Sequence, residues 1–149
     1  MTGPITRRLA LALALGAAFV AVIPASAHAT APAAETISVD RGAAGDFWSA
    51  TGAFADAGTL ADSPQGPPTR SGTYHVFRTY SSSDGTFEVR ADVKIIPMAP
   101  GVFAVTGYWT VISGTGAYAD LRGTGTLTET FDANSGTVVG TWQGLVHFD

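Results

Sequence analysis

The 149-residue chain has no cysteine, so disulfides and thiol chemistry are excluded and the fold must rest on a packed core. Charge is also scarce: 13% of the residues are charged, with 8 basic residues against 12 acidic ones. This balance offers no positive surface for nucleic acid and disfavours anionic membranes as partners. Apolar residues make up 46% of the chain, which is enough to build a core.

The chain also lacks a hydrophobic run of the roughly twenty residues that span a bilayer. Its apolar stretch at 11–23 follows two arginines and precedes the small-x-small sequence Ala-Ser-Ala, a pattern typical of a secretory signal peptide. We therefore predict a signal peptide over 1–27, cleavage after Ala27 and a secreted protein without a membrane anchor. A retained anchor is the alternative. Without Arg7 and Arg8 the chain keeps 6 basic residues and a formal net charge of −6.

Helical periodicity is absent, and no twelve-residue window shows a helical apolar stripe. The signal that is present has period two. In TFEVRADVKII (86–96), apolar and charged side chains alternate, which predicts a strand with one dry and one wet face. Residues 28–35 are small and aperiodic, which predicts a flexible leader before one domain at 36–149.

Similar alternating runs recur along the chain and are separated by Gly/Pro-rich turns. They predict strands at 36–40, 47–55, 73–80, 86–96, 102–112, 124–132 and 137–148, with room for an eighth within 57–70. An up-and-down succession of this kind exposes its edges unless it closes. We therefore predict an all-β fold: an antiparallel, eight-stranded closed barrel of meander topology, with seven strands visible.

The segment GTGAYADLRGTG (114–125) begins with a match to the G-x-G-x-x-G/A fingerprint of dinucleotide-binding proteins. That site needs a helix after the turn and a strand–helix–strand unit, but the next residues alternate like a strand. The segment instead predicts a corner between two strands that packs on the barrel end. The corner residues are Gly114, Gly116, Tyr118, Leu121, Gly123 and Gly125.

The succession GYWTVISGTGAYADLRGTGTLT, with TGAFADAGT before it and GTWQGLVHF after it, resembles the allene oxide cyclase/dirigent-like barrels, which are related to the calycins. The resemblance covers about 47–148 and is specific over about 106–127. It implies an eight-stranded antiparallel barrel and a secreted bacterial-type member. Plant members cyclise an epoxide or orient radical coupling with polar residues inside the barrel, and none of those residues aligns individually with this chain.

Glu129 shares an apolar strand face with Leu127 and Phe131, and a lone buried carboxylate costs several kcal/mol. It must be paired, protonated or in contact with cavity water. Arg78 is a candidate partner. A four-residue loop at Ser82–Gly85 sets Arg78 opposite Val89 and inward; a three- or five-residue loop turns His75 inward instead. A solvated Arg78–Glu129 pair at the barrel rim is the alternative.

Trp109 and Trp142 each lie on an apolar strand face, where they either line a pocket or pack the core. The predicted ligand-binding residues are thus Arg78, Trp109, Glu129 and Trp142, with Glu129 the candidate catalytic group. The spacing of the histidines fits no metal site, and no cofactor is predicted.

Three functions remain open. The first is a non-catalytic binder of an apolar or mixed-polarity small molecule. The second is an isomerase or cyclase of the allene-oxide-cyclase kind, in which Glu129 stabilises positive charge. The third is an extracellular interaction module that uses the threonine-rich strand 124–130.

Overall fold

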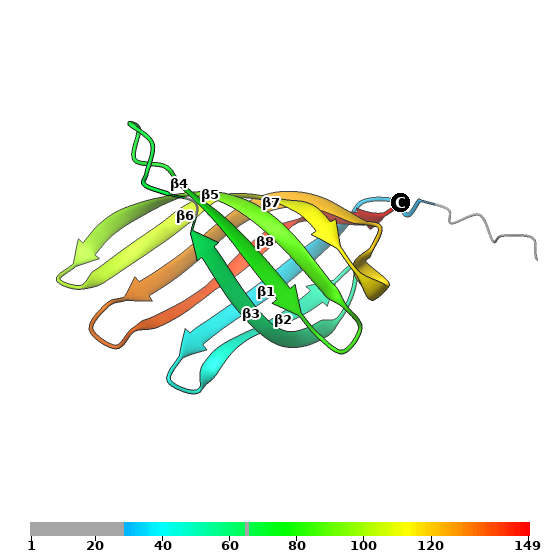
Figure 1. The fold of residues 1–149 in the computed structure, drawn as a ribbon, viewed down its shortest axis with the longest axis horizontal. Coiled ribbons are helices and arrows are strands. Elements are labelled where there is room, and N and C mark those ends of the chain that lie inside the picture. The colour runs from blue at the N-terminus through cyan, green and yellow to red at the C-terminus, as the bar shows by residue number, and fades with distance from the viewer. Residues whose placement is uncertain (1–28, 65) are drawn as a thin grey trace, which may run out of the picture.

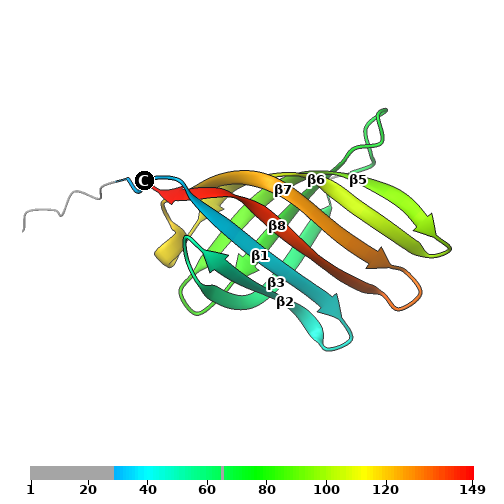
Figure 2. The same cartoon turned by 180° about the vertical axis from the view of Figure 1, so that it is seen from behind.

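The computed structural model describes residues 29–64 and 66–149; the predicted signal peptide and His28 lie outside them. Each strand pairs antiparallel with the next, and β1 also pairs with β8, so the sheet closes (Figures 1 and 2). The fold is all-β, an eight-stranded antiparallel closed barrel with meander strand order, as predicted. Its elements are β1 (Ala33–Gly42), β2 (Gly45–Gly52), β3 (Asp56–Pro64), β4 (Tyr74–Ser81), β5 (Thr86–Ala99), β6 (Val102–Gly114), the 3₁₀ turn η1 (Gly116–Tyr118), β7 (Leu121–Asp132) and β8 (Thr137–Phe148).

The predicted strands are all present, and the eighth strand is β3, which begins one residue before the predicted segment 57–70 and otherwise lies in it. Several boundaries differ from the prediction: β1, β5, β6 and β7 are longer than predicted, and β2 begins at Gly45 rather than 47. β1 begins at Ala33, so residues 33–35 of the expected leader pair with β8, and Glu35 is buried. β2 ends at Gly52, before the predicted limit of 55. No helix within 29–64 and 66–149 is long and apolar enough to cross a membrane.

One end of the barrel is filled by aromatic side chains. Tyr80 and Phe87 stack with ring centroids 4.7 Å apart, and Trp48 meets both rings edge-on. Phe54 and Tyr118 continue this packing toward the chain's C-terminus. We call this end the aromatic end. It lies on the right in Figure 1, where η1 and the C-terminus are found.

The glycine-rich corner belongs to the aromatic end. η1 connects the antiparallel strands β6 and β7, so the segment has no strand–helix–strand unit. Tyr118 and Leu121 are 3% and 1% exposed and pack on the core, as predicted. Gly116 has φ +60°, and a Cβ there would lie 2.3 Å from the carbonyl oxygen of Asp84. The glycine therefore lets η1 lie directly against the β4–β5 turn.

The other end of the barrel is formed by the tips of the β1–β2, β5–β6 and β7–β8 hairpins, on the left in Figure 1. We call it the mouth. The β5–β6 hairpin carries exposed apolar side chains there, among them Ile96 and Met98. The barrel interior is thus filled with rings at one end and hollow at the other.

Candidate functional site

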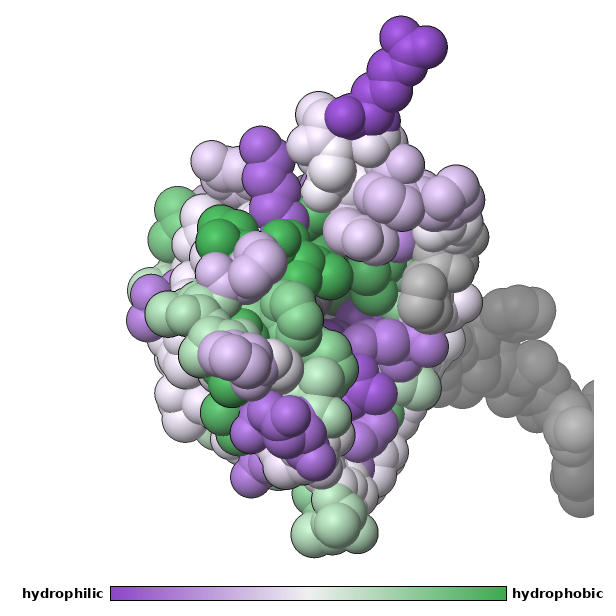
Figure 3. All heavy atoms as spheres, turned by 90° about the vertical axis from the view of Figure 1, so that its left-hand side faces the viewer, coloured by the Kyte–Doolittle hydropathy of each residue, from purple (hydrophilic) through white to green (hydrophobic). Residues whose placement is uncertain are grey.

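The mouth opens into a pocket of about 610 Å³ inside the barrel. Figure 3 faces this end and shows an apolar area beside a hollow whose other side is polar. Residues from seven strands and from the β3–β4 loop line the pocket. They are Arg41, Asp62, Gly66, Tyr74, Val76, Arg78, Ala91, Val93, Ile95, Val105, Glu129, Phe131, Val138 and Trp142.

The β4–β5 register places Arg78 in this pocket. Arg78 pairs with Val89, so the four-residue loop Ser82–Gly85 is the one formed, and Arg78 points inward. Its side chain is buried, with 3% of the residue exposed. His75 lies on the outer face, where its Nδ1 is 2.5 Å from Asp92 Oδ1. Of the two registers open from the sequence, the structure has the one with Arg78 inside.

Arg78 and Glu129 form a buried ion pair between Nη1 and Oε1. Glu129 is 5% exposed, so the alternative of a solvated pair at the rim does not hold. Oε1 also accepts a hydrogen bond from Trp142 Nε1 at 2.8 Å. The Arg78 guanidinium lies over the Trp142 ring at 4.7 Å from its centroid, a cation–π contact.

Asp62 of β3 holds the rest of the Arg78 guanidinium. Its two oxygens accept from Nε at 2.5 Å and Nη2 at 2.9 Å, a bidentate geometry that fixes the plane of the guanidinium. Asp62 also pairs with Arg41 Nη1, and Arg41 Nη2 reaches Asp46 at 2.8 Å. Together with Glu129, these residues form a chain of alternating charge, which we call the charge network: Asp46, Arg41, Asp62, Arg78 and Glu129.

The network keeps its arginines charged. Burial works against the charge of Arg78, but the hydrogen bonds to Asp62 and the nearby carboxylates outweigh it and raise its pKa. Arg41 shows the same balance of burial against Asp46 and Asp62, and its pKa is also raised. The hydrogen bond from Arg41 lowers the pKa of Asp46. Arg78 and Arg41 therefore carry fixed positive charges at neutral pH.

Three of the four predicted ligand-binding residues, Arg78, Glu129 and Trp142, line the pocket together. Trp109 does not line it; it is 2% exposed and packs against Trp142. Its indole occupies a slot beside Gly125 and Gly144, where a Cβ would lie 2.7 and 2.6 Å from the ring. Its Nε1 donates to the carbonyl of Thr126 at 3.1 Å. Trp109 therefore packs in the core with the hydrogen bond of its indole N–H satisfied.

Asp62 and Arg41 belong to the site, although the sequence patterns do not single them out. Asp62 lies in β3, whose sequence DAGTLADSP has one large apolar residue and no clear alternation. Strand parity was the available signal, because Asp62 follows the buried Leu60 by two residues and Arg41 follows the buried Val39 by two. Residues two apart on a strand face the same side, so both charges point inward.

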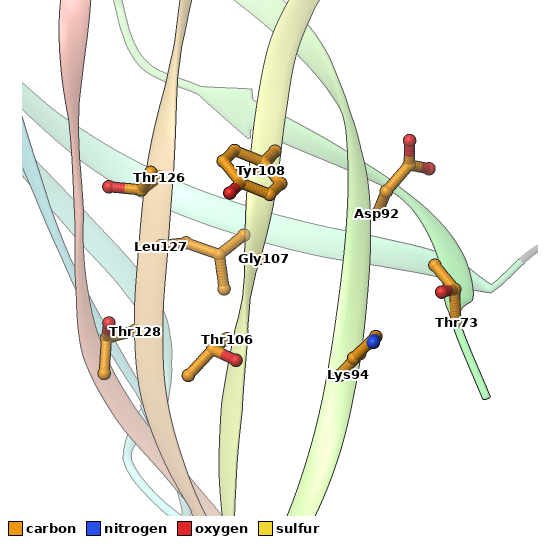
Figure 4. Close-up of a pocket in the computed structure, with 9 residues that line it drawn as sticks. All are labelled: Thr73, Asp92, Lys94, Thr106, Gly107, Tyr108, Thr126, Leu127 and Thr128. Carbon is orange, nitrogen blue, oxygen red and sulfur yellow. The ribbon is translucent and has the colours of Figure 1, made fainter. Parts of the chain in front are cut away.

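A second hollow, of about 560 Å³, lies on the outer face of β5–β7 (Figure 4). Tyr108, 72% exposed, stands among Thr106, Thr126 and Thr128, with Asp92 and Lys94 on the neighbouring strand. The side chains there belong to the outer surface. The hollow therefore lacks the buried polar groups that the barrel pocket has.

A scan against protein-family models finds no match for this chain. Searches of curated proteins and of solved structures also find no significant match.

Proposed function

We propose that this chain is a small secreted binding protein that holds an apolar molecule with one polar end inside the barrel, without catalysis. The observation that supports it most is the pocket at the mouth, with apolar walls over a buried charge network. Pockets of several hundred Å³ with a few convergent polar groups are typical of small-molecule sites. The resemblance to allene oxide cyclase/dirigent-like barrels is compatible with this proposal.

Filling part of the barrel with the charge network is energetically costly, because its charged groups lose contact with water. Buried ion pairs are often no more stabilising than apolar side chains of similar volume. The aromatic end of the same barrel is closed by packed rings. Because apolar packing would stabilise the pocket region equally well, the presence of the charge network there supports a role in binding rather than in stability.

The pocket lining also favours binding over covalent chemistry. Among its described residues there is no serine, cysteine, histidine or lysine to serve as a nucleophile or a neutral base. Arg78, Asp62 and one oxygen of Glu129 are held by one another. Such groups position a ligand and are poorly placed to exchange protons with it.

Blocking the mouth tests the proposal, with the neutral apolar dye Nile red as the probe. Val138 lines the pocket, whereas its neighbour Val139 is 50% exposed on the outer face. Val138→Trp should weaken dye binding about tenfold or more by filling the pocket, and Val139→Trp should leave it unchanged. Equal binding by wild type and Val138→Trp would refute the pocket as the site.

A cyclase or isomerase of the allene-oxide-cyclase kind is the second proposal. It is supported by one oxygen of Glu129, Oε2, which accepts no hydrogen bond from any described residue. A free carboxylate oxygen in a largely apolar pocket stabilises developing positive charge. Recovery of an altered molecule after incubation with a bound ligand would favour this function over simple binding.

Secretion is part of the first proposal and is supported by the pattern of residues 1–27. Intact-mass measurement of exported protein should show a chain that begins at His28. Retention of residues 1–27 on the exported chain would contradict it.

A further inference from the structure

The carboxylate of Glu129 is only half satisfied. Oε1 accepts from both Arg78 Nη1 and Trp142 Nε1, whereas Oε2 has no donor among the residues that the structure describes. Although Glu129 is only 5% exposed, Oε2 is not among the unpartnered polar atoms that are fully shielded from solvent. Because Glu129 lines the pocket, Oε2 is an acceptor that a ligand can reach.

Two other unpartnered polar atoms near the pocket are out of reach of a ligand. Among the described residues, Arg41 Nε and the Tyr80 hydroxyl have no hydrogen-bond partner, but both are shielded from solvent. Both oxygens of Asp62 are occupied by arginine N–H groups. At the charge network the pocket thus offers a ligand one reachable acceptor, Glu129 Oε2, while the Tyr74 hydroxyl lines the pocket four residues before Arg78 on the same strand face.

The charges that line the pocket determine which polar group of a ligand can approach Glu129 Oε2. The charged residues that line the pocket are two arginines, Arg41 and Arg78, and two carboxylates, Asp62 and Glu129, so their charges cancel. A ligand carboxylate would meet the carboxylate of Glu129 at short range without a free cation to balance it. A ligand ammonium would lie beside the Arg78 guanidinium, which is bound to the same carboxylate. A neutral donor avoids both penalties.

The side chains that form the pocket walls indicate the chemistry of the remainder of the ligand. From Glu129 toward the mouth, the lining includes Phe131 and Val138, and on the neighbouring strands β6 and β5 it includes Val105 and Val93. These side chains offer contacts to a hydrocarbon and no further hydrogen bonds. We propose that the pocket selects a neutral alcohol, with its hydroxyl donating to Glu129 Oε2 and its hydrocarbon skeleton directed toward the mouth. This inference rests on the proposed binding function.

Three compounds of one chain length test this on the wild-type protein: dodecanol, dodecyl methyl ether and dodecanoate, each measured by displacement of Nile red. Dodecanol should bind about tenfold or more tightly than the ether, which has no O–H to donate, and more tightly than dodecanoate. If all three displace the dye equally, or dodecanoate binds best, the inference is overturned while the binding function stands. If Nile red itself does not bind, both fail.

Glu129→Gln gives a sharper form of the same test. The amide oxygen must replace Oε1, because Arg78 and Trp142 both donate there. The amide nitrogen then replaces Oε2, so the pocket presents a donor and gains a net positive charge. The preference for dodecanol over its ether should disappear, and dodecanoate should bind more tightly than to wild type. An unchanged order of affinities would overturn the assignment.

Glu35→Gln is the matched control. Glu35 is also a buried carboxylate, 2% exposed, but it lies toward the aromatic end and accepts from the backbone N–H groups of Thr36 and Phe54. The same chemical change there should leave the order of the three affinities as in wild type. Loss of the alcohol preference in this variant too would overturn the specific role of Glu129.

Discussion

Arg78 supplies the positive charge that is paired with the buried carboxylate of Glu129. Replacing it by Met would leave Glu129 buried with only the Trp142 N–H as a donor, so Arg78→Met should lower the free energy of unfolding by about 3–5 kcal/mol. The double variant Arg78→Met/Glu129→Leu should recover part of this loss, because no lone carboxylate remains there. Urea unfolding of both variants measures it, and a double variant less stable than the single one would contradict it.

Tyr118 and Asp56 form a hydrogen-bonded pair at the aromatic end, and each perturbs the other's titration. Hydrogen bonds from Ser82 and then Tyr118 lower the pKa of Asp56, while burial and then the bond to Asp56 raise the pKa of Tyr118. Stability from Asp56 is complete above the unfolded-state pKa of about 4 and is lost as pH falls through its lower folded-state value. Stability from Tyr118 is complete below about pH 10 and is lost as pH rises further.

Tyr118→Phe should therefore cost about 1 kcal/mol at neutral pH, the typical worth of one hydrogen bond. Its difference from wild type should shrink toward acid, where Asp56 is protonated, and toward strong alkali, where the unfolded tyrosine ionises. Urea unfolding across the pH range measures this dependence. A difference that stays constant at both extremes would mean that the Tyr118–Asp56 bond does not contribute.

At the level of single residues, strand parity predicted much of the site. Glu129 shares a face with Leu127 and Phe131, and this alternation alone indicates that its side chain points into the barrel. The position of Arg78 depended on one loop length, which the sequence left open. The partnership of Asp62 with both arginines joins β1, β3 and β4, and no local pattern reports which side chains meet across a barrel.

At the level of elements, η1 and the β4–β5 turn hold each other. Ala117 N donates to the Asp84 carbonyl at 2.9 Å, and Thr115 N donates to that of Thr86 at 2.7 Å. The glycine pattern predicted a corner here because it was incompatible with a crossover helix. What it did not predict is the neighbouring turn against which the corner packs.

Gly116→Ala should be much more damaging than Gly136→Ala. Both glycines have positive φ, +60° and +71°, which costs an alanine about 1–2 kcal/mol. Around Gly136 there is no atom within 4 Å of an added Cβ, whereas at Gly116 the Cβ would collide with the Asp84 carbonyl. Thermal unfolding of the two variants compares them, and equal losses would mean that the corner does not depend on close contact.

At the level of the whole molecule, the chain's first and last strands are paired over their length, from Ala33–Val146 to Arg41–Val138. A closed barrel has no free edge at which unfolding can begin. Native-state hydrogen exchange should therefore show β1 and β8 amides protected to nearly the same free energy as those of β5 and β6. Much weaker protection of β1 and β8 would show that the barrel opens at this seam.

Closure was predictable because seven alternating runs leave edges that only closure removes, whereas the division of the interior into two halves was not. That division depends on the size of the inward side chains. Those at one end are aromatic rings, at Trp48, Tyr80 and Phe87, and several at the other end are small, at Val76, Ala91 and Val105. Each run reads equally apolar in the sequence. Only the register around the barrel brings Trp48, Tyr80 and Phe87 together at one end.

The aromatic end also constrains exchange of whatever the pocket holds. Because packed rings close that end, the mouth is the route by which a ligand enters and also the route by which it leaves. A second molecule cannot follow behind and push the first one out on the far side. The rate of release should therefore be a property of the complex alone, the same at low and at high concentration of a competing ligand.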